Sequence, residues 1–224
     1  MSTGVDQLFK DKVLGHPAGL FVLFFTEMWE RFSYYGMRAI LVIFLTGAVI
    51  GDNPGWEWST SAALSLLGTY AMLVYLTPLV GGWLADNKIG YRMAVVIGAL
   101  LMTLGHASMA IETPASLYIG IALLILGNGF FKPNMTSIIS KMYDGHEDKK
   151  DGAYNIFLYG CQRRRIFGNY ALWLGRRESR MELRLRVGRY FYAFGNASIL
   201  LCTTAFWRYW VQTTKERKQS RSAI

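Results

Sequence analysis

The stretch FFTEMWERFSYYGMRAILVIFL, residues 24–45, carries the strongest structural signal in this chain. It has the length and apolar content of a helix that crosses a bilayer, yet it contains two glutamates and two arginines. A charged side chain at mid-bilayer depth costs at least about 2.5 to 3.5 kcal/mol on insertion scales, so such residues usually face a bundle interior or a wet cavity. The stretch therefore predicts a membrane helix whose polar face is turned toward other helices.

The composition of the whole chain favours a membrane protein with several spans. Its 224 residues are 52% hydrophobic and 15% aromatic, and the run 93–111 has no acidic residue, Lys or Arg over 19 residues. We predict four membrane helices and the start of a fifth, over residues 17–46, 59–84, 91–111, 114–140 and 151–160. Gly-, Asn- and Pro-containing turns separate them. The two cysteines, Cys161 and Cys202, indicate no disulfide framework.

The charges of the loops predict the orientation of these helices. Basic residues precede the first helix, lie between the second and third, and follow the fourth: Lys10, Lys12, Lys88, Arg92, Lys141, Lys149 and Lys150. The charged residues in the connections after the first and third helices are all acidic: Asp52, Glu57 and Glu112. By the positive-inside rule, residues 1–16 form a cytoplasmic N-terminus.

The formal net charge of +9 does not indicate a nucleic-acid-binding protein, because it is unevenly distributed. Residues 1–160 have 10 Lys and Arg against 12 Asp and Glu, whereas residues 161–224 have 14 against 3. The basicity therefore belongs to the tail.

The polar residues of the first helix form one stripe. At 100° per residue, six of them fall within an arc of about 140°: Glu27, Glu30, Arg31, Tyr34, Tyr35 and Arg38. Glu27 and Arg31 are four residues apart, so one can neutralise the other until a competing anion arrives, as a proton-coupled carrier requires. The alternative is a structural ion pair that locks this helix to its neighbours. The number of polar side chains on one face favours the carrier.

Three segments resemble the proton-dependent oligopeptide transporters (the POT or PTR family), a branch of the major facilitator superfamily. The motif Glu27-Met-Trp-Glu30-Arg31-Phe32-Ser-Tyr34-Tyr35 matches the ExxERFxYY signature of that family. GGWLADNKIGYR (81–92) is similar to the superfamily's loop between helices 2 and 3, and GNGFFKPN (127–134) to the family's helix 4. The resemblance covers about residues 17–160 and implies an all-α membrane protein, with four helices and part of a fifth from an N-terminal six-helix bundle.

The resemblance also implies roles for particular residues. Those of proton coupling would be Glu27, Glu30, Arg31 and Lys132. Those of substrate binding would be Tyr34, Tyr35, Arg38, Tyr75 and Lys132, with Arg38 near the peptide's C-terminal carboxylate. Alternatively, Lys132 could snorkel to an interface, and Tyr75 could be ordinary packing. We interpret His106 as a neutral, hydrogen-bonded residue of the third helix.

The implied function is proton-coupled symport of di- and tripeptides across the cytoplasmic (inner) membrane. We expect a monomeric, multi-pass carrier driven by the proton gradient, with no enzymatic activity, cofactor, metal or nucleic-acid partner. Two alternatives remain: a short membrane protein whose basic tail binds anionic lipid or nucleic acid, and a major facilitator carrier of another solute. Large apolar residues among the arginines of the tail argue against the first, and the helix 1 signature argues against the second.

The resemblance ends near residue 160, where the family continues with a segment like G-x-N-x-G-A-F and this chain reads CQRRRIFG. Three arginines early in a membrane helix are very costly. If Cys161 to Gly168 are written in permitted codons, omitting one base gives V-N-A-G-A-F-L-G, and the same operation on Arg186 to Gly195 gives a plausible sixth helix. We therefore expect residues 161–224 to be out-of-frame translation, and this chain to be a fragment that does not transport.

Overall fold

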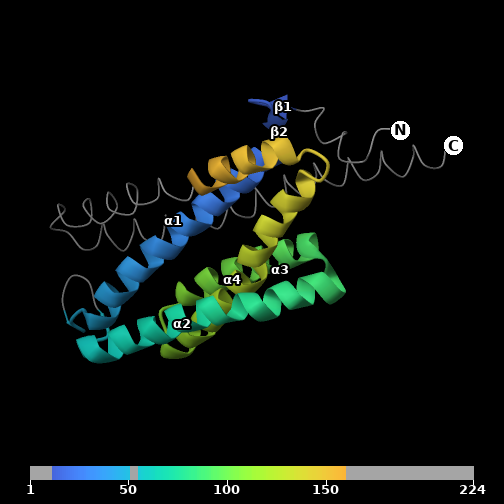
Figure 1. The fold of residues 1–224 in the computed structure, drawn as a ribbon. Coiled ribbons are helices and arrows are strands. Elements are labelled where there is room, and N and C mark those ends of the chain that lie inside the picture. The colour runs from blue at the N-terminus through green and yellow to red at the C-terminus, as the bar shows by residue number, and fades with distance from the viewer. Residues whose placement is uncertain (1–11, 51–54, 160–224) are drawn as a thin grey trace.

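The computed structural model describes residues 12–50 and 55–159, which form a bundle of long helices (Figure 1). A small antiparallel hairpin, β1 (Lys12–Val13) and β2 (His16–Pro17), comes first. The helices that follow are α1 (Ala18–Thr46), α2 (Thr60–Leu84), α3 (Tyr91–Met109) and α4 (Pro114–Met142). The four predicted helices are confirmed, with ends within two residues of those expected. The residues 1–11 of the expected cytoplasmic segment and the tail 161–224 lie outside the described residues.

The helix ends follow from local sequence signals. Ser59 caps α2 by accepting a hydrogen bond from the Ala62 amide at 3.3 Å. At the start of α4, Thr113 and Ser116 form a reciprocal capping box around Pro114. The helix α2 continues into one π-helical turn, η1 (Ala85–Ile89), before the chain turns into α3. Beyond α4, residues 147–159 are helical as well, so the fifth helix begins four residues earlier than predicted.

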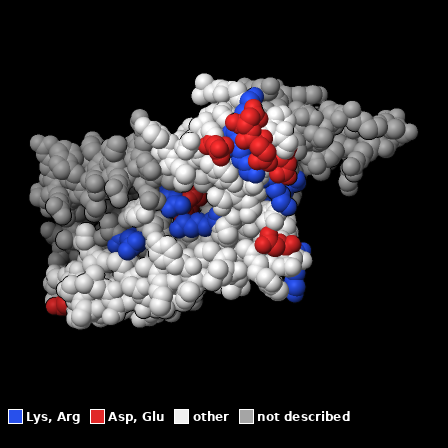
Figure 2. Space-filling model, in the orientation of Figure 1, with Lys and Arg blue, Asp and Glu red and all other residues white. Residues whose placement is uncertain are grey.

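The described residues contain three helices that are long and apolar enough to span a membrane: Thr60–Ile89, Tyr91–Met109 and Pro114–Met142. Helix α1 has 29 residues, as many as α4, but its four charged side chains set it apart from that apolar class. Lys, Arg, Asp and Glu gather mainly at the end of the bundle where α4 finishes and α2 turns into α3 (Figure 2). This distribution suits helices whose flanks lie in lipid and whose ends reach water.

Glycines let α2, α3 and α4 approach one another closely. A Cβ atom built on Gly98 of α3 would lie 2.7 Å from the Gly127 carbonyl oxygen of α4, and a Cβ on Gly105 would lie 2.9 Å from the Gly120 carbonyl oxygen. On the other side of α4, a Cβ on Gly129 would lie 2.7 Å from Thr77 of α2. Small residues at such crossings are how membrane helices gain packing contacts without a hydrophobic driving force between them.

The hairpin is attached to the end of α4. Nδ1 of His16 lies 2.7 Å from the Tyr143 hydroxyl, within hydrogen-bonding distance. Burial, and after it the charge of Lys149, lower the pKa of His16, while burial raises the pKa of Tyr143. Both side chains are therefore neutral near pH 7. Because folding lowers the pKa of His16, the stabilisation from this neutral contact is present above the ordinary imidazole pKa of about 6.5 and is lost as the pH falls through the lowered pKa of the folded protein.

The glycine packing makes a direct prediction about stability. Gly98→Ala places a methyl group against the backbone of α4 and is expected to cost about 1 to 3 kcal/mol through overpacking. Gly68→Ala, on an exposed part of α2 where an added Cβ meets nothing within 4 Å, is the matched control. Thermal unfolding in detergent, followed by size-exclusion chromatography, measures both. Equal melting temperatures for the two variants would contradict the tight crossing of α3 and α4.

Candidate functional site

Helix α1 buries its two glutamates inside the bundle. Glu27 is 2% exposed and Glu30 is 3% exposed. Arg31, one turn after Glu27, contacts a single carboxylate oxygen with two of its nitrogens: Nε lies 2.6 Å and Nη2 2.5 Å from Oε1 of Glu27. A charged group buried in an apolar helix bundle is tolerated when an opposite charge and hydrogen bonds compensate it. The two acids of the predicted stripe therefore face inward, toward the other helices.

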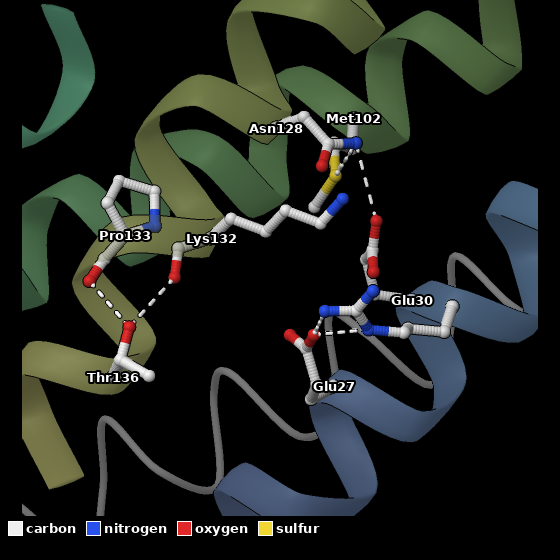
Figure 3. Close-up of polar contacts among 8 residues, drawn as sticks. Glu27, Glu30, Met102, Asn128, Lys132, Pro133 and Thr136 are labelled. Carbon is white, nitrogen blue, oxygen red and sulfur yellow. Dashed lines mark hydrogen bonds and ion pairs between the residues drawn. The ribbon is translucent and has the colours of Figure 1, made fainter. Parts of the chain in front are cut away.

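Glu30 faces α3 and α4 rather than its own helix. Nδ2 of Asn128 donates a hydrogen bond to Oε1 of Glu30 at 3.3 Å and lies 3.8 Å from the sulfur of Met102. Lys132 is one turn beyond Asn128 on α4, and Figure 3 shows its side chain extending toward Glu30. The helix 4 lysine and the helix 1 acid are thus brought together across the bundle.

Tyr34 is the aromatic centre of the site. Nζ of Lys132 lies 5.1 Å from the centroid of its ring, and Cζ of Arg38 lies 5.4 Å from it, both within cation–π range. Nη1 of Arg38 also donates a hydrogen bond to the Tyr34 hydroxyl at 3.4 Å. The ring of Tyr35 stacks edge-on at 5.2 Å, and that of Tyr70 from α2 lies at 5.9 Å. The ring of Tyr34 is therefore in cation–π contact with two cations from different helices, Arg38 of α1 and Lys132 of α4.

Tyr75 of α2 is 78% exposed, unlike the buried residues of the predicted site. Tyr35 is 36% exposed, so it lies at the edge of the cluster. Glu27 and Glu30 are buried, while Arg31, Arg38 and Lys132 are half-buried. Figure 2 shows basic side chains and an acidic one in a hollow of an otherwise uncharged surface.

The structure adds polar residues that the sequence did not single out. Asn128 is 2% exposed, and Ser33 is 6% exposed. The hydroxyl of Ser33 lies 3.0 Å from Nε2 of His106, so His106 is hydrogen-bonded, as predicted. Sequence spacing held a signal for Asn128, because it precedes Lys132 by four residues and so shares its face of the helix.

A small cavity lies among these residues. Its volume is about 10 Å³, roughly the space that one water molecule needs. All four helices contribute to its lining: Glu30, Ser33, Tyr34, Met37, Tyr70, Met102, His106, Leu124 and Asn128.

Acidic and basic side chains that lie within a bundle of apolar, membrane-length helices, beside a hollow of the surface, define a class of protein. They are the features of a membrane transport protein, in which intramembrane charges mark the path of substrate or ions.

Comparison with known proteins identifies the family within this class. Residues 92–162 match the sequence model of the POT family. Over 149 residues, the chain is 43% identical to a di-/tripeptide transporter of Lactococcus lactis subsp. cremoris, a match that spans 65% of this chain and 30% of that protein. It is 40% identical over 147 residues to the uncharacterized transporter YclF of Bacillus subtilis (strain 168), with the same two coverages. The chain thus spans about a third of the length of these relatives.

Solved structures agree with the sequence comparison. A peptide transporter POT in complex with sulfate superposes with a TM-score of 0.77 at 36% identity, over 92% of this chain and 41% of that one. A POT family transporter in complex with a thioalcohol-conjugated peptide superposes with a TM-score of 0.81 at 30% identity, over the same two shares. The chain belongs to the POT family, and it spans only part of the length of these members.

The pairing of Glu27 with Arg31 predicts a coupled pair of mutations. Arg31→Met leaves the buried carboxylate without its cation and is expected to cost about 3 to 5 kcal/mol. Adding Glu27→Gln removes the stranded charge, so the double variant should recover most of that loss. Thermal unfolding of the four proteins of the cycle in detergent measures the coupling. Additive effects of the two changes would show that the pair is energetically independent.

Proposed function

We propose that the full-length form of this protein carries out proton-coupled symport of di- and tripeptides across the cytoplasmic membrane. The observation that carries the proposal is the position of Lys132, whose ammonium group lies over Tyr34 and extends toward the buried Glu30. The relatives named as di-/tripeptide transporters support the choice of substrate. We further propose a monomeric carrier with a cytoplasmic N-terminus, as the loop charges indicate.

Substrate binding in this proposal uses the two cations around Tyr34. Arg38 and Lys132 together offer a positively charged site for the C-terminal carboxylate of a peptide. The aromatic rings of Tyr34, Tyr35 and Tyr75 form walls that accept side chains of different shapes. The acids of α1 favour the positive end of the same molecule. A short zwitterion thus finds both of its ends matched.

Proton coupling in this proposal follows from the competition for Lys132. An ionised Glu30 attracts the ammonium group of Lys132, whose side chain extends toward it (Figure 3). When Glu30 takes up a proton, that attraction is lost, and Lys132 becomes available to the peptide carboxylate. Glu27 and Arg31 stay paired beside them and keep the remaining charge balanced. Binding of proton and peptide therefore favour each other.

The role of Glu30 is tested with the full-length transporter in the restored reading frame, reconstituted in liposomes. Glu30→Gln is expected to abolish peptide accumulation driven by a proton gradient, while counterflow of labelled peptide is partly retained, because binding needs no change of protonation. Glu57→Gln changes an exposed acid in the loop after α1 and should retain both activities. Gradient-driven accumulation by the Glu30 variant at the normal level would remove Glu30 from the coupling role.

We also propose that a frameshift near codons 158–161 produced residues 161–224. The match to the family model ends at residue 162, which supports a change of reading frame at this place. Genomic DNA across codons 150–165 should contain codons that give V-N-A-G-A-F-L-G when one base is skipped. Liposomes with the 224-residue chain should then take up peptide at the background rate. Genomic DNA that lacks these alternative codons would contradict the proposed frameshift.

A further inference from the structure

The cavity beside Glu30 contains two buried acceptor atoms. Among the residues that the structure describes, Oε2 of Glu30 and Oδ1 of Asn128 have no hydrogen-bond partner. Glu30 is 3% exposed and Asn128 is 2% exposed, and both side chains line the cavity. A buried acceptor without a hydrogen bond lowers the stability of the folded protein by about 1 to 3 kcal/mol. Two such atoms beside the space for one water molecule point to a bound donor.

A water molecule fits this requirement better than a side chain does. It has two O–H groups, and the two acceptors here each need one. The cavity of about 10 Å³ is at the lower limit for one water, and its walls are polar on the side of Glu30 and Asn128.

We propose that Asn128, together with one water molecule in this cavity, is the positioning partner of Glu30 in both protonation states. With Glu30 ionised, Nδ2 of Asn128 donates to Oε1 and the water donates to Oε2. With Glu30 protonated, the new O–H group at Oε2 donates to the water oxygen, and the water in turn donates to Oδ1 of Asn128. The carboxyl group thus takes up a proton without losing its place beside Lys132.

A carboxamide is suited to this role because it carries a donor and an acceptor and does not itself titrate. The charged and titratable groups around Glu30 and its cavity come from all four helices: Glu27, Arg31 and Tyr34 on α1, Lys132 on α4, His106 on α3 and Tyr70 on α2. Their electrostatic influence on Glu30 can change as partners bind. Asn128 does not titrate, so its hydrogen bond to Glu30 needs no change in its own charge. The inference rests on the proposed role of Glu30 in transport.

The first test measures the hydrogen bond itself, on the 224-residue chain in lipid nanodiscs. Infrared difference spectra between alkaline and acidic buffer show the carboxyl stretch of protonated Glu30, which is assigned by its loss in Glu30→Gln. Asn128→Ala should move this band, because the carboxyl loses its partner. Asn128→Asp, which has the same shape and lacks the amide donor, should move it too and covers the case in which Asn128→Ala does not fold.

Asn134→Ala is the matched control for this experiment. Asn134 is 1% exposed on the same helix, but its Nδ2 donates to the Phe130 carbonyl of α4 at 2.6 Å and not to Glu30. Its variant should leave the Glu30 band in place. A band that stays unmoved in both variants of Asn128 overturns the inference. A water band that shifts in oxygen-labelled water and vanishes in Asn128→Ala supports the bridging water, and its absence overturns that part.

The second test separates positioning from binding in the full-length transporter. Asn128→Ala should reduce gradient-driven peptide uptake about tenfold and leave counterflow within about twofold of the unchanged protein. Asn134→Ala should reduce neither. An equal loss of both activities would indicate a structural role and overturn the proposal. If the full-length protein took up no peptide at all, the proposed function would fail, while a moved infrared band would still support the contact of Asn128 with Glu30.

Discussion

The burial of charge on α1 is the constraint on which the rest of the bundle depends. Two carboxylates lie within a helix of mostly apolar residues, and each requires compensation from a neighbour. Glu27 obtains it within α1, from Arg31 one turn away. Glu30 obtains it from α4, through Asn128 and the nearby ammonium group of Lys132. Because the hydrogen bond to Glu30 comes from another helix, α1 and α4 must keep a defined position relative to each other.

The glycines of α4 explain how that position is reached. Gly127 packs against Gly98 of α3, and Gly129 packs against Thr77 of α2. Successive residues of a helix point about 100° apart, so Asn128 between them is directed away from both of these contacts. That direction is toward Glu30 of α1, to which Asn128 donates its hydrogen bond. The close approach of three helices thus orients the polar group that meets the fourth.

Sequence reasoning predicted the helices well because apolar length, proline and glycine mark them directly. It also predicted that the stripe on α1 faces inward, since the cost of charge in lipid leaves few other arrangements. It missed Asn128 and Ser33, because the partners that give them a role, Glu30 and His106, lie on other helices. The exposure of Tyr75 could not be foreseen either, since it depends on how α2 lies against its neighbours. Contacts between helices far apart in the chain are what the pattern along one helix leaves out.

Pro133 has a mechanical consequence for this arrangement. It lies inside α4, directly after Lys132, and has no N–H group to donate to the carbonyl of Gly129 one turn earlier. Helix α4 is therefore least stiff at this point, where bending breaks no hydrogen bond of the helical ladder. Asn128 lies before this joint and Lys132 lies at it. A small bend of the helix there would move the ammonium group toward or away from Glu30 and leave the amide contact in place.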